Sequence, residues 1–191
     1  MPRSTEEPLA LPLLAVMARS GEAIDAVLPE ARARFGDILA SSPDYSFDAF
    51  TNYYEPEFGA GLVKRVIFFA TPREQRCLAD DKLWSNALEA PERSEDNFCD
   101  PVSPPPRRRI INLDPGYLTL SKLVLASTKD HAQRIYLGQG IWAEITLAYR
   151  GKSFERHPWS YPDYISLIPF INTVRQDMRA RVAGDVMHHL R

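Results

Sequence analysis

Cysteine is scarce in this 191-residue chain, which holds only Cys77 and Cys99. Two cysteines cannot make a disulfide framework, and these two lack the close pairing that is typical of zinc sites. We therefore expect reduced thiols, a cytoplasmic location and no metal site. No residue pattern in the sequence indicates a particular cofactor.

Long apolar runs are also missing. The run Leu9–Ala18 is shorter than the ~20 apolar residues that a membrane-spanning helix needs. A secretory signal peptide would need a positively charged start, whereas Arg3 is offset there by Glu6 and Glu7. We interpret the run as a strand that is buried on both faces, and we expect no association with a membrane.

The chain carries no large excess of either charge. Its 23 Lys and Arg against 25 Asp and Glu leave a net charge of −2, which argues against nucleic-acid binding over the whole surface and leaves only a local basic patch for that role. The hydrophobic content of 45% is ordinary for a globular protein, and the length suits one domain with a core. We expect a single domain over 9–183, a disordered start (1–8), an exposed proline-rich loop (91–108) and a frayed tail (184–191).

The familiar reaction signatures are absent from the sequence. There is no H-E-x-x-H, no G-x-S-x-G and no dinucleotide-binding fingerprint. A phosphate-binding loop is half present, because Gly151-Lys152-Ser153 has the right ending but Thr146 stands where the first glycine belongs. These absences leave open whether the protein is an enzyme.

The chain does contain an alternation of strand and helix patterns. Strands are expected at 11–17, 45–50, 62–70 and 110–113. Helices are expected at 22–35 and 72–90, and Pro29 indicates that the first of them is either kinked or starts late. This order is typical of an α+β fold, in which helices pack on one side of a mostly antiparallel sheet. We predict a ferredoxin-like arrangement with an added C-terminal hairpin and helix.

The helix predicted at 72–90 has a clear division of faces. Helical spacing places Leu78 and Leu83 toward the core, with Trp84 and Leu88 as further candidates. The same spacing directs Lys82 and Glu89 to water.

The segment that follows residue 110 contains a turn signal and an ambiguous stretch. Asp114-Pro115-Gly116 has the chemistry of a turn, because proline presets φ and glycine tolerates positive φ. Residues 119–129 fit either a helix or a strand. Thr119 or Ser121 as an N-cap favours the helix.

A β-hairpin is predicted over residues 134–149, because Gly138-Gln139-Gly140 supplies glycine where a tight loop needs positive φ. The expected pairing sets Leu137 opposite Ile141, Arg134 opposite Glu144 and Tyr136 opposite Trp142. Alternation then assigns one face to the core: Ile135, Leu137, Ile141, Ala143, Ile145 and Leu147. The other face carries Arg134, Tyr136, Trp142, Glu144 and Thr146. A last helix is expected to begin at Ser166.

Charged and aromatic side chains from this region form the candidate ligand-binding site. They are Lys122, Lys129, Asp130, His131, Arg134, Tyr136, Trp142 and Glu144. Lysine and arginine bind phosphate, histidine exchanges protons near neutral pH, and an aromatic face stacks on a base. The expected partner is a phosphorylated small molecule or a nucleotide. A second polar wall is expected from Asp48, Tyr53, Tyr54 and Glu55.

The alternatives use the same residues differently. Arg134 and Glu144 can form an ordinary cross-strand pair, worth roughly 0.2–1 kcal/mol. The face of Tyr136 and Trp142, together with Arg107–Arg109, can instead be the contact surface of a non-catalytic protein–protein interaction module. RNA binding is a third alternative, which needs these arginines and the lysines of the cluster on one continuous surface.

One block of sequence is distinctive: residues 112–147 read NLDPGYLTLSKLVLASTKDHAQRIYLGQGIWAEITL. Three shorter stretches accompany it: FDAFTNYYEPEFG (47–59), KLWSNALE (82–89) and PWSYPDY (158–164). Together these stretches resemble a bacterial family, domain of unknown function 4416, over most of 11–175. The resemblance implies a soluble bacterial protein, and members of the family are sometimes labelled GTP-binding. It implies no reaction, and the 91–108 loop is longer and richer in proline than the family pattern.

Overall fold

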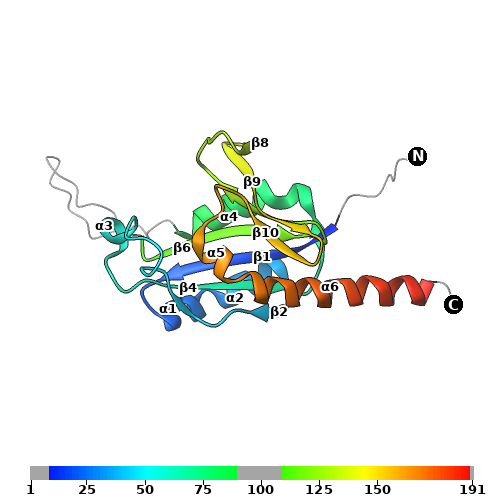
Figure 1. Ribbon diagram of the computed structural model, residues 1–191. Coiled ribbons are helices and arrows are strands. Elements are labelled where there is room, and N and C mark those ends of the chain that lie inside the picture. Colours follow the sequence, from blue (N-terminus) through cyan, green and yellow to red (C-terminus); the bar gives the residue numbers. More distant parts are fainter. Residues whose placement is uncertain (1–8, 90–108, 190–191) are drawn as a thin grey trace, which may run out of the picture.

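The computed structural model describes residues 9–89 and 109–189, and the side chains of the last helix to residue 181. Its strands are β1 (Leu9–Ala18), β2 (Ile38–Ser41), β3 (Tyr45–Ser46), β4 (Val63–Phe69), β5 (Arg73–Glu74), β6 (Ile111–Leu118), β7 (Lys122–Ser127), β8 (Arg134–Gly138), β9 (Ile141–Arg150) and β10 (Ser153–Arg156). They form one ten-stranded sheet with the main order β10-β9-β7-β6-β1-β4-β2, and every pair is antiparallel (Figure 1).

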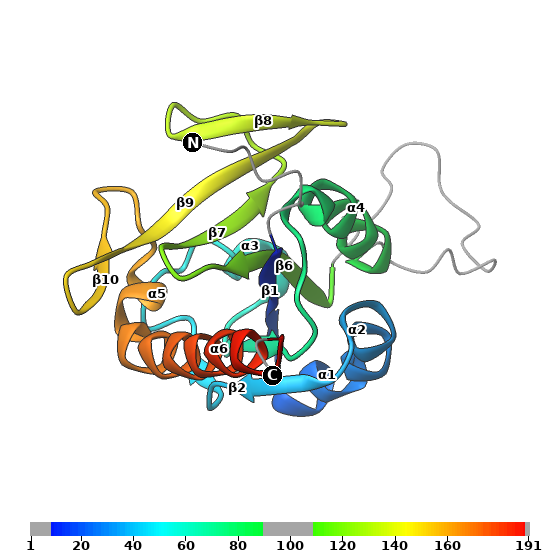
Figure 2. The ribbon, with the colours of Figure 1, turned by 90° about the vertical axis from the view of Figure 1, so that its right-hand side faces the viewer.

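The helices lie on both faces of this sheet. They are α1 (Gly21–Ala26), α2 (Leu28–Phe35), α3 (Glu55–Phe58), the 3-10 helix η1 (Gln75–Cys77), α4 (Leu78–Glu89), α5 (Pro162–Ser166) and α6 (Ile168–His189). Figure 2 shows α6 on one side of β1 and α2 and α4 on the other. No helix of the described part of the chain is long and apolar enough to cross a membrane.

The predicted α+β class and ferredoxin-like arrangement are confirmed. Strand β1, helices α1 and α2, strands β2 and β4, helix α4 and strand β6 follow one another in a β-α-β-β-α-β order. In the sheet the four strands stand in the order β6-β1-β4-β2. The second strand lies earlier than predicted, at Ile38–Ser41, and only Tyr45–Ser46 of the expected 45–50 strand pairs with β4.

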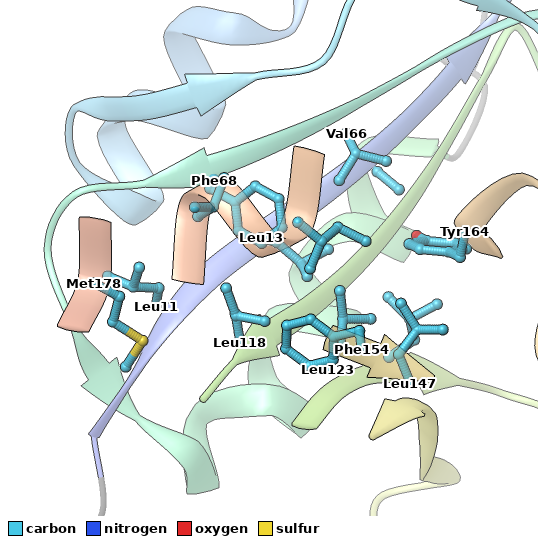
Figure 3. Close-up of a cluster of buried hydrophobic side chains, with 14 residues drawn as sticks. Leu11, Leu13, Val66, Phe68, Leu118, Leu123, Leu147, Phe154, Tyr164 and Met178 are labelled. Carbon is cyan, nitrogen blue, oxygen red and sulfur yellow. The ribbon is translucent and has the colours of Figure 1, made fainter. Parts of the chain in front are cut away.

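Strand β1 is the centre of the fold because its apolar run supplies both faces. Leu11 and Leu13 point into a core cluster with α6, and Leu14 and Val16 into a second cluster with α1 and α2. The prediction placed all helices on one side, as holds for α1, α2 and α4. The C-terminal helix α6 covers the other face, which would otherwise expose the first cluster, drawn in Figure 3.

The first helical segment is divided, as the predicted kink requires. Helix α1 begins at the N-cap Ser20, whose hydroxyl accepts a hydrogen bond from the Ala23 amide at 3.3 Å. It ends at Val27, and α2 begins again with Pro29 in its first turn, where a missing N–H is harmless. Gly36, with φ of 88°, ends α2.

Residues 122–127 form strand β7, so the predicted helix at 119–129 is wrong. The hydroxyl of Thr119 does accept backbone N–H bonds, from Ser121 at 3.2 Å and Lys122 at 3.0 Å. These bonds close a tight turn between β6 and β7 instead of starting a helix, since the same hydroxyl chemistry serves both structures. β7 then pairs with β9 along its whole length.

Asp114-Pro115-Gly116 lies inside β6, so the predicted turn there is wrong as well. Pro115 stands opposite Leu14 of β1. Backbone N–H groups of a strand point alternately to its two neighbours, so Pro115 faces the same way as Leu113, whose N–H points away from β1 to Glu89. The missing N–H of Pro115 therefore costs no hydrogen bond to β1. Gly116 is needed for close approach: a Cβ atom there would lie 2.3 Å from the carbonyl oxygen of Val124.

Strands β6 and β7 then diverge. They pair only between residues 116–118 and 123–125, whereas β6 pairs with β1 from Ile111 to Leu118. The two strands therefore lie very close together at Gly116 and separate from there toward Ile111, which leaves an opening in the sheet between them.

The predicted hairpin is confirmed as β8 and β9, with Arg134 opposite Glu144 and Tyr136 opposite Trp142. Gly138, not Leu137, stands opposite Ile141, because β8 carries one extra residue there. The predicted faces are right in part: Ile141 and Leu147 are buried as expected. They are wrong elsewhere, because Ile135, Leu137 and Ile145 are exposed and Glu144 and Thr146 are buried.

Two features explain which residues of β9 are buried. The pairing with β7 shifts between Leu123 and Val124, so Thr146 is an extra residue and Leu147 returns to the core. The segment 157–161 then crosses over the polar face, where the Trp159 indole N–H donates to the Ile145 carbonyl at 3.0 Å. The Ser160 hydroxyl also donates to the Thr146 carbonyl.

Gly116→Ala should destabilise the protein by about 3 kcal/mol or more, because the added methyl group meets backbone that cannot give way. Gly61→Ala is the comparison: a Cβ there has open space, and the φ of +84° alone costs roughly 1–2 kcal/mol. Urea unfolding of both variants measures the difference. Equal losses would show that the crossing of β6 and β7 tolerates a side chain.

Candidate functional site

A cavity of about 870 Å³ lies where β6 and β7 diverge. Its walls come from the ends of β1, β4, β6, β7 and β9, from the 47–57 segment, and from the 127–134 and 161–164 segments. Helix α4 closes the opening from behind, since Leu78 and Ala79 pack against β7 and β9 while Trp84 packs beside β1 and β6. Aromatic side chains of the wall are Phe47, Phe50, Tyr53, Tyr54, Tyr161 and Tyr164.

The back of the cavity depends on two charged residues of α4. The Lys82 ammonium group donates to the Leu113 carbonyl at 2.8 Å, and the Leu113 N–H donates to the Glu89 carboxylate at 2.7 Å. These side chains satisfy both backbone groups of Leu113 on the edge of β6 that β7 has left. Lys82 and Glu89 are therefore buried, and their predicted exposure to water is wrong. Leu83, expected inside, is 36% exposed.

Acidic and basic groups alternate along this wall. Lys82 also contacts Asp114 at 3.1 Å, and Asn112 donates to the other oxygen of Asp114 at 2.7 Å. Burial alone would raise the pKa of Asp114, but the positive charges of Lys82 and Lys64 outweigh it and lower that pKa. Asp114 is thus a fixed negative charge within the cavity.

Arg109 joins the far wall to α4. Its guanidinium donates to both carboxylate oxygens of Glu57, at 2.6 and 3.1 Å, and to Glu89 at 2.6 Å. The hydrogen bond from Arg109 lowers the pKa of Glu57. Because these partners occupy its donors, Arg109 acts here as a structural cross-link between α3 and α4.

Lys64 forms a second buried ion pair, with Asp163 at 2.6 Å. The Tyr45 hydroxyl donates to the same carboxylate oxygen at 3.0 Å, and the Lys64 ammonium lies 4.7 Å from the centre of the Tyr164 ring. This cluster ties β4 to the start of α5. Lys64 is not among the site residues predicted from the sequence, and the available signal was its charge within the otherwise apolar strand pattern of residues 62–70.

Arg134 and Glu144 form the third buried pair, with 2.8 Å between Nε and Oε2. The other Arg134 donors bind the Ser127 hydroxyl at 2.6 Å, the Lys129 carbonyl at 2.9 Å and the Tyr161 hydroxyl at 3.0 Å. Arg134 therefore holds together three parts of the cavity wall. Its side chain is only 5% exposed, so it is more deeply placed than a surface cross-strand pair.

Lys129 and His131 differ from these cations because both are exposed at the cavity wall. The Lys129 ammonium lies 3.3 Å from the Tyr53 hydroxyl and 5.1 Å from the centre of its ring. Among the residues that the structure describes, Lys129 has no carboxylate partner within ion-pairing distance.

The structure brings together half of the sequence-predicted cluster. Lys129, His131, Arg134 and Glu144 line the cavity, together with Tyr53 and Tyr54 of the expected second wall. Lys122 lies at the opposite end of β7 from Ser127, and Asp130 points to solvent outside the cavity lining. Tyr136 and Trp142 pack against each other with tilted rings, 5.1 Å between ring centres, and neither belongs to that lining. Asp48 accepts the Gly61 and Leu62 amides, and so shapes a loop.

Two atoms in the cavity wall have no hydrogen-bond partner within the described residues. They are the Oε1 atom of Glu144 and the hydroxyl of Tyr164, and both are buried. Burial, followed by the charge of Asp163, raises the pKa of Tyr164 well above its ordinary value, so this hydroxyl keeps its proton. Figure 3 shows Tyr164 at one end of the core cluster, opposite Met178.

The described residues show no metal-binding group. No set of three or more His, Cys, Asp or Glu side chains converges among them. Cys77 is a free thiol, and Cys99 lies outside the described residues.

Lys82→Met should destabilise the protein by about 3–5 kcal/mol, because it leaves the Leu113 carbonyl and a buried carboxylate without their cation. Lys152→Met is the matched control in an exposed turn, with an expected change within about 0.5 kcal/mol. Guanidinium unfolding gives both values. A loss below about 1 kcal/mol at Lys82 would contradict its role at the strand edge.

Tyr164→Phe should leave the melting temperature unchanged or raise it, because it removes a buried hydroxyl that has no partner in the described residues. Tyr45→Phe is the contrast, since it removes a 3.0 Å hydrogen bond to the Asp163 carboxylate and should cost about 1.5–3 kcal/mol. Thermal unfolding compares the two. A large loss at Tyr164 would mean that its hydroxyl has a partner after all.

Comparison with known proteins gives one positive finding. No curated protein and no solved structure matches the chain. The family model described as domain of unknown function (DUF4416) matches residues 8–178, which include every element that lines the cavity. The chain belongs to this family, the domain of unknown function DUF4416.

Proposed function

We propose that the cavity binds a phosphorylated or nucleotide-like small molecule. Its volume of about 870 Å³ suits such a ligand, since small-molecule sites commonly occupy roughly 300–1,000 Å³. The wall combines aromatic surface with a small number of charged groups held on strands and a helix, which is the usual composition of a ligand site.

The observation that carries the proposal is the contrast between Lys129 and the other cations of the wall. Lys64, Arg109 and Arg134 each lie within 2.8 Å of a carboxylate, so their charges are already neutralised. Lys129 is exposed, and its ammonium group contacts the hydroxyl and the ring of Tyr53, whereas no carboxylate of the described residues forms an ion pair with it. His131 lines the same wall. A ligand phosphate placed here would meet a cation without displacing a protein carboxylate.

The rings around Lys129 support a planar ligand. Tyr53 and Tyr54 stand edge to face, with 5.0 Å between ring centres, on the side of the cavity formed by the 47–57 segment. Tyr161 stands on the side formed by the 161–164 segment. A base or another flat ring would find stacking surface on these side chains, and such stacking is worth about 1–3 kcal/mol per base.

Arg134 takes a different part in this proposal from the one its sequence position suggests. Its donors bind Glu144, Ser127, Lys129 and Tyr161, so it orients the wall and is not the group that binds the phosphate. Removing it would strand the buried carboxylate of Glu144 and disturb the fold, so it is a poor residue for testing ligand binding.

A second candidate function is a protein–protein contact through β8. Within the described residues this strand pairs only with β9. Its residues Ile135, Tyr136 and Leu137 are 68%, 59% and 42% exposed. Exposed apolar side chains on an edge strand are a common feature of contact surfaces. This surface is separate from the cavity lining, so the two functions do not exclude each other.

Lys129→Ala should abolish the thermal stabilisation produced by adenosine 5′-monophosphate or by millimolar inorganic phosphate, because it removes the unpaired cation of the wall. The melting temperature without additive should change little, since the residue is exposed. Lys152→Ala, an exposed lysine outside the cavity, should keep the full stabilisation. If neither additive stabilises the parent protein, or if both variants respond alike, the proposal fails.

A further inference from the structure

Glu144 is in an unusual position for a carboxylate. It lies in the middle of β9, is 2% exposed, and forms part of the cavity wall. Its Oε2 atom receives hydrogen bonds from Arg134 at 2.8 Å and from Gln133 at 3.2 Å. Its Oε1 atom receives none within the described residues. One carboxylate oxygen thus accepts two hydrogen bonds and the other accepts none.

An empty acceptor of this kind is expensive in a folded protein. A carboxylate offers only acceptor sites, and a buried one ordinarily has a donor on each oxygen. The guanidinium of Arg134 balances the charge of Glu144 through Oε2 but leaves Oε1 unsatisfied. The missing group is therefore an N–H or O–H donor. Glu144 lines the cavity, but Oε1 itself is covered, so a donor from the cavity reaches it only after a neighbouring side chain moves.

The same arginine connects this acceptor to the unpaired cation. One guanidinium donates to Glu144 Oε2 and, at 2.9 Å, to the carbonyl of Lys129. The Lys129 backbone and the Glu144 carboxylate are thus held at a set separation by a single rigid group. A ligand that carries a negative group and a hydrogen-bond donor at opposite ends matches this arrangement of a cation and an acceptor.

We propose that Glu144 Oε1 recognises an amino group on the planar part of the ligand, and that the cavity selects anionic ligands with an amino-substituted ring over otherwise identical rings without the amine. This inference rests on the proposed function, since it assigns the second end of the ligand whose anionic end lies at Lys129. Glu144 acts in it as a specificity-determining residue.

The environment of Oε1 strengthens this discrimination. The atom is shielded from bulk water, so water does not compete for it as it would at the surface. A ligand without the amine would leave the acceptor empty and would also have to bury apolar surface against it. Because Oε1 is covered, binding requires one side chain to move, and we assign this movement to Gln133, which is half-buried and bonded to the other oxygen.

The first test needs no substitution. Isothermal titration of the full chain compares adenosine 5′-monophosphate with purine riboside 5′-monophosphate, which lacks only the amino group. We expect the amino compound to bind at least about tenfold more tightly, the effect of one hydrogen bond to a charged group. Equal affinities would overturn the inference. If the two affinities were equal but Lys129→Ala lowered both of them, the proposed function would stand and only the inference about Glu144 would fail.

The second test places the preference at one residue. Glu144→Gln keeps the shape and an acceptor for Arg134 but turns an amide donor toward the amine, so the tenfold preference should disappear. Glu155→Gln is the matched control, because this carboxylate lies on β10 and is 58% exposed. A preference that persists in Glu144→Gln would assign the recognition of the amine to another group.

If Glu144→Gln does not fold, the comparison of the two nucleotides on the parent protein decides alone. If neither nucleotide binds the parent protein, both proposals fail.

Discussion

The contact of Lys82 and Glu89 with the backbone of Leu113 is the interaction on which the site depends. A β-strand that loses its neighbour in the middle of a sheet leaves unsatisfied N–H and C=O groups, and such groups are costly when buried. Here an ammonium and a carboxylate seven positions apart on α4 take the place of a strand. Because they do, β7 can leave β6 beyond Gly116 without exposing that edge.

The opening between the strands explains the chemistry of the cavity. A continuous sheet would put apolar side chains at this place, whereas the opening lets charged groups of α4, β6 and β4 reach one space. Each of the deep cations has a carboxylate beside it, and these pairs act as fixed cross-links between elements. The proposed ligand contacts are therefore the exposed Lys129 and the Oε1 atom of Glu144, which has no hydrogen-bond partner in the described residues.

The β-α-β-β-α-β order of the first part of the chain and the β8–β9 hairpin could be predicted from the sequence, because hydrophobic periodicity reports burial directly. The strand at 122–127 was predicted as a helix, since its pattern fits either structure. The opening could not be predicted. Lys82 and Glu89 have the spacing of a solvent-exposed face, and only the tertiary position of α4 turns them inward. Asp114-Pro115-Gly116 has ordinary turn chemistry, yet these residues lie in strand β6. There the missing N–H of Pro115 is tolerated, and Gly116 leaves room for the backbone of β7. Pairing in the hairpin identified Arg134 and Glu144 as partners, but their burial depends on the distant 157–164 segment.

Thr146 shows how much a single position can decide. Because β9 has one residue more than β7 at this point, Glu144 and Leu147 lie on the same face of the sheet although they are three positions apart, opposite Leu125 and Leu123 of β7. That face therefore carries a carboxylate of the cavity wall and, next to it, a leucine of the apolar core. Loss of one residue between Glu144 and Leu147 would send the two side chains to opposite faces, so either the cavity would lose its carboxylate or the core would lose its leucine.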